Sequence, residues 1–76
     1  MKEAVEMVLK SLVDDVEAVD VREVDHQGAT VIEVRVAPGD MGKVIGRQGR
    51  TIRALRSLAY AISLKRKHRY MLEVVE

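Results

Sequence analysis

Two segments of alternating apolar and polar residues, separated by a short turn, place the strongest constraint on the fold. The first segment runs from Val19 to about Asp25, and the second runs from Thr30 to Val36. From Ile32 onward, alternate residues of the second segment are apolar, which is the period of a half-buried strand. The intervening turn, His26 to Ala29, contains a glycine that can take a positive φ. The pattern predicts an antiparallel β-hairpin.

Helical spacing is present on both sides of the hairpin. Residues 3–16 carry two adjacent apolar lines, and these predict one packing helix: Ala4, Val8, Leu12, Val16 and Val5, Leu9, Val13. After the hairpin, Asp40 is placed to cap a short helix from Met41 to Ile45 with its carboxylate. A longer helix is predicted from Gly49 or Arg50 to about Leu64, and a last strand from Arg69 to Val75.

The predicted order is helix, strand, strand, helix, helix, strand. With 76 residues the chain has room for one core, so we expect a single domain over residues 1–76. The two-helix connection lets the last strand return parallel to the second by a right-handed crossover. We therefore predict an α+β two-layer sandwich, with a three-stranded mixed sheet packed by three helices.

Charge is strongly segregated along the chain. Residues 1–40 carry four basic and ten acidic side chains, whereas residues 41–76 carry nine basic and two acidic ones. No acidic residue occurs from Met41 to Leu72. This segregation predicts one positive face, which is typical of a polyanion-binding protein, although a dipolar or self-associating surface is the alternative.

The stretch Val44 to Ile52, VIGRQGRTI, lies within the basic half. Its two glycines stand between the predicted helices, and the amino terminus of the longer helix attracts phosphate. Arg47 and Arg50 flank this point, Lys43 lies one turn earlier, and Gln48 adds a donor. Alone, G-x-x-G also describes a plain helix–helix turn, but the apolar and basic flanks favour a loop that holds a nucleic-acid backbone.

The same stretch resembles the V-I-G-x-x-G-x-x-I signature of K-homology (KH) RNA-binding domains, and the element order is similar to the type II arrangement. The segments Leu9–Asp14 and Arg35–Gly46 extend a resemblance to the KhpA family of small bacterial KH proteins over essentially the whole chain. The resemblance implies that Gly46–Gly49 grips the backbone of about four single-stranded nucleotides. Ile45 and Ile52 would face the bases, and Leu55 would be mainly core. The short loop His26–Ala29 would stand on the opposite wall of the groove.

Pattern and resemblance together give one set of expected RNA-binding residues: Lys43, Ile45, Gly46, Arg47, Gln48, Gly49, Arg50, Ile52 and Arg53. Arg53 and Arg56 can extend the phosphate track or form a solvated helix face. The cluster Lys65–Arg69 is either a second electrostatic patch or an ordinary helix end.

The resemblance also implies a partner, either a second copy or a larger multidomain KH protein of the KhpB (Jag/EloR) type. The predicted helix 50–64 offers Tyr60 and Ile62, or Ala61 and Leu64, as a dimer surface. The alternative function is a protein-interaction module that keeps the KH shape, and regulation of cell shape and cell wall is the process that the family suggests.

Composition excludes several other classes. Two tyrosines, without Phe or Trp, cannot build the aromatic platforms on which other RNA-binding folds stack bases. The chain has no cysteine, its two histidines lack ligand-spaced companions, and no nucleophile–base set occurs, so we expect no metal, no cofactor and no catalysis. The interrupted apolar pattern at the amino terminus predicts no signal peptide or membrane span, and hence a cytoplasmic protein.

Overall fold

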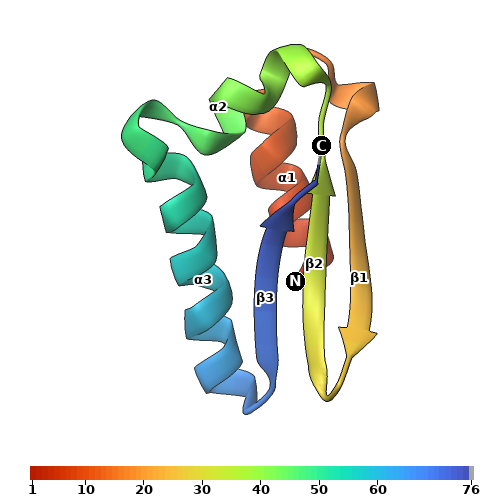
Figure 1. Cartoon of the computed structure of the whole chain (residues 1–76), viewed down its shortest axis with the longest axis vertical. Helices are drawn as coiled ribbons and strands as arrows, with labels where there is room; N and C mark the ends of the chain where they lie inside the picture. Colours follow the sequence, from red (N-terminus) through yellow and green to blue (C-terminus); the bar gives the residue numbers. More distant parts are fainter. Residues whose placement is uncertain (76) are drawn as a thin grey trace.

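The computed structural model describes residues 1–75 and confirms the predicted order of elements (Figure 1). The helices are α1 (Lys2–Leu12), α2 (Met41–Ile45) and α3 (Arg50–Arg66). The strands are β1 (Asp20–His26), β2 (Ala29–Arg35) and β3 (Arg69–Val74). Three short 3-10 turns, η1 to η3, cover Val16–Ala18, Pro38–Asp40 and Arg47–Gly49.

The sheet is mixed, as predicted. β2 is the central strand, pairing antiparallel with β1 and parallel with β3. The register places Glu23 opposite Ile32 in the first pair and Ile32 opposite Leu72 in the second. Ile32 of β2 is thereby centred on the sheet face that the helices cover.

One face of the sheet carries the core. Ile32 and Val34 are fully buried there, together with Val5 and Leu9 of α1 and Val44 of α2. α3 contributes Ile52, Leu55 and Ala59 to the same cluster. The helices and the sheet therefore form the two predicted layers, and the α+β sandwich is confirmed (Figure 1).

α1 is shorter than predicted, because a distant carboxylate binds the chain beyond its carboxyl end. The helix ends at Leu12, and Val13 is already extended. The carboxylate of Asp40, 4% exposed, accepts hydrogen bonds from the backbone N–H groups of Asp14 (3.3 Å) and Asp15 (3.1 Å). The predicted cap on α2 is therefore wrong: Asp40 precedes α2 but its side chain does not cap that helix, since it binds the chain after α1 instead.

Only one of the two apolar lines of α1 is buried. Val5 and Leu9 are fully covered, whereas Val8 and Leu12 are each 37% exposed. Val16, predicted to complete the second line, lies in η1 and is 45% exposed. The helical layer therefore keeps an apolar strip at its surface.

α3 and β3 meet at a tight turn. α3 continues two residues beyond the predicted Leu64 and ends at Arg66, where Lys67 takes a left-handed conformation with φ +54°. β3 ends at Val74 rather than Val75, although the N–H of Val75 still donates to the carbonyl oxygen of Val34 at 2.8 Å.

The β1–β2 hairpin lies at the opposite end of the molecule from the Gly46–Gly49 loop (Figure 1). Ala29 pairs with Arg69, and the Thr30 Oγ1 lies 2.8 Å from the His68 Nε2, so the hairpin stands beside the carboxyl end of α3. The expectation that His26–Ala29 faces the loop across a groove is therefore wrong. The expectation was taken from the arrangement usual in the family that the sequence resembles. In this chain, the sheet topology places the turn His26–Ala29 beside the carboxyl end of α3.

In residues 1–75, no helix has the length and apolar character needed to cross a membrane.

Candidate nucleic-acid interface

The loop Gly46–Gly49 has an unusual backbone. Three of its four residues have positive φ: Gly46 (+79°), Gln48 (+57°) and Gly49 (+72°). Gln48 and Gly49 are left-handed in succession, whereas Gly46 combines its positive φ with an extended ψ of 168°. The loop therefore has a backbone in which glycine is favoured at Gly46 and Gly49, and its contact with phosphate stays a prediction.

Gly46 also permits a close approach that no other residue allows. A Cβ at this position would lie 2.8 Å from both the Cβ and the backbone nitrogen of Thr51, and closer still to the Thr51 hydroxyl. The first turn of α3 is thus folded against the loop. Gly49 is different, because a Cβ there would make only ordinary contacts, the nearest at 3.8 Å with Arg53.

Hydrogen bonds hold the loop in place. The N–H of Gly46 donates to Gly42 at 2.8 Å and the N–H of Gly49 donates to Gly46 at 3.1 Å. The Arg53 guanidinium donates to the carbonyl oxygen of Gln48. Arg53, predicted to bind RNA, therefore lies at the loop, where it supports the left-handed Gln48; its contact with phosphate stays a prediction.

The amino terminus of α3 opens directly onto this loop. The first N–H groups of a helix have no partner within the helix, and within residues 1–75 no side chain caps those of α3. Arg47, Gln48 and Arg50 are exposed around this point. The structure thus brings the predicted donors together at one end of a 17-residue helix, with the positive end of its dipole at the loop.

The predicted apolar residues divide into two kinds. Ile45 is 41% exposed and presents apolar surface beside the loop. Ile52 is 8% exposed and Leu55 is 5% exposed, and both belong to the core. Leu55 is confirmed as a core residue, whereas the contact of Ile52 with bases stays a prediction.

Lys43 has partners of its own. Its ammonium group is hydrogen-bonded to the Asp14 carboxylate and lies 3.5 Å from an oxygen of Asp40. The hydrogen bond with Asp14 raises the pKa of Lys43. The backbone N–H of Asp15, followed by that of Asp14 and the charge of Lys43, lowers the pKa of Asp40 despite its burial. Lys43 ties the α1 connection to α2, and its contact with RNA stays a prediction.

Sequence reasoning missed a hollow along the outer side of β3. Between α3 and this edge strand lies a cavity of about 330 Å³, bordered by Arg56, Ala59 and Tyr60 on the helix and by residues 70–73 on the strand. Arg56 therefore faces this edge. The three-residue spacing of Arg50, Arg53 and Arg56 indicates this basic side of α3 from the sequence. That β3 lies beside it could be known only from the fold.

Comparison with known proteins identifies the family of the chain. The family described as "KhpA/KhpB, KH domain" matches residues 2–74. The chain belongs to the KhpA/KhpB family of KH domains. The predicted resemblance is thereby confirmed.

Curated KhpA relatives match the chain over nearly its whole length. "RNA-binding protein KhpA" of Caldanaerobacter subterraneus subsp. tengcongensis is 47% identical over 75 residues, covering 99% of this chain and 100% of the relative. The protein of the same name from Halalkalibacterium halodurans is 47% identical over 76 residues, covering 100% of both chains. That of Aquifex aeolicus is 46% identical, covering 100% of this chain and 96% of the relative. No solved structure matches the chain significantly.

Proposed function

We propose that this protein is a non-catalytic RNA-binding protein that holds short single-stranded RNA at the loop Gly46–Gly49. The observation that carries the proposal is the loop itself: three positive φ angles lead into a long helix whose amino terminus no described side chain caps. The names of the KhpA relatives, "RNA-binding protein", support the same function.

Different residues around the loop would contact the phosphates and the bases of the RNA. Backbone N–H groups of the loop and the guanidinium groups of Arg47 and Arg50 contact the phosphates. Ile45, exposed beside the loop, contacts the bases, and Ile52 contributes the small part of its surface that reaches the groove. Because backbone contacts carry no sequence information, we expect a modest base preference.

The charge distribution supports a polyanionic partner. The acid-free stretch from Met41 to Leu72 forms α2, the loop, α3 and most of β3, which are contiguous in the fold (Figure 1). The acidic residues are concentrated in α1, β1, β2 and their connections. RNA would therefore approach the side of the molecule that carries the loop.

One loop contacts few nucleotides, so useful affinity calls for a second binding module. Exposed apolar surface on α3 supports dimer formation: Leu58 is 39% exposed, and Ala61 lies three residues farther along the same helix. Leu64, another predicted dimer residue, lines a cavity at the carboxyl end of α3. Ile62, an alternative in the sequence prediction, is half-buried in the monomer. We infer that Leu58 and Ala61 meet either a second copy or a larger KhpB-type protein, and that the protein acts in the cytoplasm.

The double substitution Arg47→Asp with Gln48→Asp tests the RNA-binding proposal. It places negative charge where phosphate would lie and should reduce affinity for single-stranded RNA at least about 100-fold, since it removes and reverses charge-assisted contacts. Fluorescence anisotropy with labelled oligonucleotides measures the effect. Gln27→Asp with Arg35→Asp is the matched control, because it makes the same charge change on exposed residues of the β1–β2 side.

Salt titration and oligomeric state separate the alternatives. Three to four phosphate contacts predict a log–log slope of about −2 to −3 for wild-type binding. Affinity that survives the loop substitution, or a flat salt dependence, would favour a protein-interaction module instead. Ala61→Glu should disrupt the dimer, as measured by light scattering, while the circular dichroism of the fold is retained.

A further inference from the structure

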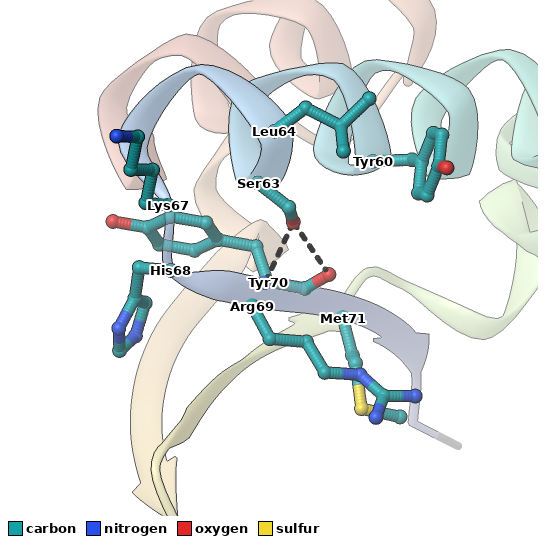
Figure 2. A pocket seen from close by; sticks show the side chains of 8 residues that line it. All are labelled: Tyr60, Ser63, Leu64, Lys67, His68, Arg69, Tyr70 and Met71. Atoms are coloured by element: carbon teal, nitrogen blue, oxygen red, sulfur yellow. Dashed lines mark hydrogen bonds between the residues drawn. The ribbon is translucent and has the colours of Figure 1, made fainter.

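A second and larger cavity lies at the end of α3 that is farthest from the loop (Figure 2). Its volume is about 450 Å³, and within residues 1–75 none of its lining side chains is acidic. Both tyrosines of the chain take part in it. It is lined by Tyr60, Ser63, Leu64, Lys67, His68, Arg69, Tyr70 and Met71.

The residues that line the cavity come from two elements. Figure 2 shows Tyr60 and Leu64 projecting from α3, whereas Arg69 and Met71 project from β3 on the side of the strand that is turned away from the helix. Tyr60 is 66% exposed, so most of its ring is free of packing in the monomer and is open to a ligand. Lys67 and Arg69 place positive charge at the end where α3 gives way to β3.

The floor of the cavity is fixed by hydrogen bonds. The Ser63 hydroxyl donates to the carbonyl oxygen of Ala59 at 2.8 Å and accepts the N–H of Tyr70 at 2.8 Å (Figure 2 shows the Tyr70 contacts). The rings of His68 and Tyr70 stack edge to face, with centroids 5.0 Å apart. The turn between α3 and β3 is thus held by its own side chains, and the cavity exists before any ligand arrives.

The two cavities beside β3 adjoin each other along α3. They share Tyr60, Tyr70 and Met71, and Arg56 lines the one nearer the loop. The 17 residues of α3 separate the loop from Lys67, a rise of roughly 25 Å at 1.5 Å per residue. Arg50, Arg53 and Arg56 lie between these two points at three-residue spacing, so positive charge continues from the loop toward the far cavity.

We propose that the far cavity is a second subsite for the same RNA strand, beyond the nucleotides held by the loop. A base stacks on the Tyr60 ring, and the adjoining phosphates pair with Lys67 and Arg69. The subsite rests on the proposed RNA-binding function, and it adds that the single-stranded RNA runs along α3.

The chemistry of the cavity favours a nucleotide over an apolar protein segment. A flat aromatic face beside cations suits a base with its phosphate, and stacking on aromatic side chains tolerates any base. An apolar segment from another protein would cover Lys67 and Arg69 without supplying partners, which is unfavourable for charged groups. Composition alone argued against stacking because there are only two tyrosines, but the fold brings both to one place.

The test compares single-stranded RNA of about four nucleotides, the length gripped by a KH loop, with RNA of about eight. Both are bound to the wild type and to two variants, Tyr60→Ser and Lys67→Gln with Arg69→Gln. Lys65→Gln with Arg66→Gln is the matched control, because it removes two charges from the same helix end without altering the lining of the cavity.

We expect the eight-nucleotide RNA to bind wild type at least about tenfold more tightly than the four-nucleotide RNA, as stacking of one base and two phosphate contacts predict. Both cavity variants should lose most of this gain in affinity for the eight-nucleotide RNA, while they bind the four-nucleotide RNA as the wild type does. The control variant, Lys65→Gln with Arg66→Gln, should keep the gain. Since the chain has no tryptophan and both tyrosines line this cavity, its intrinsic fluorescence should be quenched by the long RNA and unchanged by the short one.

Three results would overturn the subsite. The first is that the control variant loses the higher affinity for the longer RNA to the same extent as the cavity variants. Positive charge at this end of the helix would then explain the gain without a defined subsite. The second is an unchanged gain in both cavity variants. The third is a change of oligomeric mass in the Tyr60 variant with no change in length dependence, which would indicate a protein contact. Failure of wild type to bind RNA of either length would instead refute the proposed function itself.

Discussion

The dipeptide Gln-Gly occurs twice in this chain with nearly the same φ angles, yet the two copies have different surroundings. Gln27 and Gly28 have φ of +51° and +83°, and Gln48 and Gly49 have +57° and +72°. The first pair joins the antiparallel strands β1 and β2, whose ladder uses the neighbouring amides. The second pair leads into α3, whose first turn no described side chain caps, and arginines stand on both sides.

The two turns differ in what surrounds them, and the proposed anion site at the loop rests on that difference. At the hairpin, the Thr30 hydroxyl donates to the Asp25 carboxylate at 2.9 Å, so these two polar side chains beside the turn are already hydrogen-bonded to each other. At the loop, the same turn adjoins the positive end of a helix dipole and Gly46, whose lack of a Cβ lets the helix fold back. The anion binding that we propose for the loop would therefore depend on α3 and Gly46 as well as on the turn.

The largest effect should come from Gly46→Ala. The new Cβ would meet the Thr51 backbone, and alanine disfavours φ of +79°, so we expect a loss of about 2–4 kcal/mol in the free energy of unfolding. Gly28→Ala, which meets no atom within 4 Å, should cost about 1 kcal/mol through backbone strain alone. Urea unfolding of both variants checks this, and equal losses would contradict the role given to Thr51.

A smaller effect is expected at Asp40, which connects the loop end to α1. Its pKa is lowered in the folded state, so its contribution to stability is complete above the ordinary value of 3.8 and is lost as the pH falls through the folded pKa. Asp40→Asn should therefore lower the melting temperature at neutral pH and weaken the acid dependence below 3.8.

Asp25→Asn is the control at the hairpin end, because Asp25 is exposed and its side chain accepts only the Thr30 hydroxyl within residues 1–75. It should change the melting temperature less than Asp40→Asn does. Thermal unfolding followed from neutral to acid pH measures both variants, and parallel curves for wild type and Asp40→Asn would refute the assignment.

The smallest effect is expected from replacing each of the two glutamines with asparagine. Asparagine adopts left-handed angles more readily, so Gln27→Asn and Gln48→Asn should each stabilise the fold by about 0.5 kcal/mol. Because the φ angles of the two glutamines are alike, the gains should match in thermal unfolding. A gain at Gln27 alone would show that Arg53, through its bond to Gln48, already offsets the strain at the loop.

The fold was largely predictable because its signals are local. The alternation around Ile32, the turn at Gly28 and the helical spacing from Ile52 to Ala59 each identify an element without help from the rest of the chain. The parallel return of β3 follows from the length of the crossover. The loop could be identified for the same reason, since its glycines, arginines and isoleucines lie within one short stretch.

The remaining features depend on contacts between distant residues. Nothing around Val13 shows that Asp40, 25 residues away from Asp15, would take the amides that follow α1. The pairing of Lys43 with Asp14 is equally long-range. The two cavities beside β3 require the strand and α3 to be placed together, and neither segment shows this alone.

The bond between Ser63 and Tyr70 has a consequence for the solubility of the molecule. β3 is an edge strand, and such an edge offers unpaired amides to which a strand from another chain can add, leading to aggregation. The N–H of Tyr70 is already donated to the Ser63 hydroxyl. The first outward amide of the edge is thus withdrawn from strand addition, and a single serine on the neighbouring helix helps a short, open sheet resist joining another sheet.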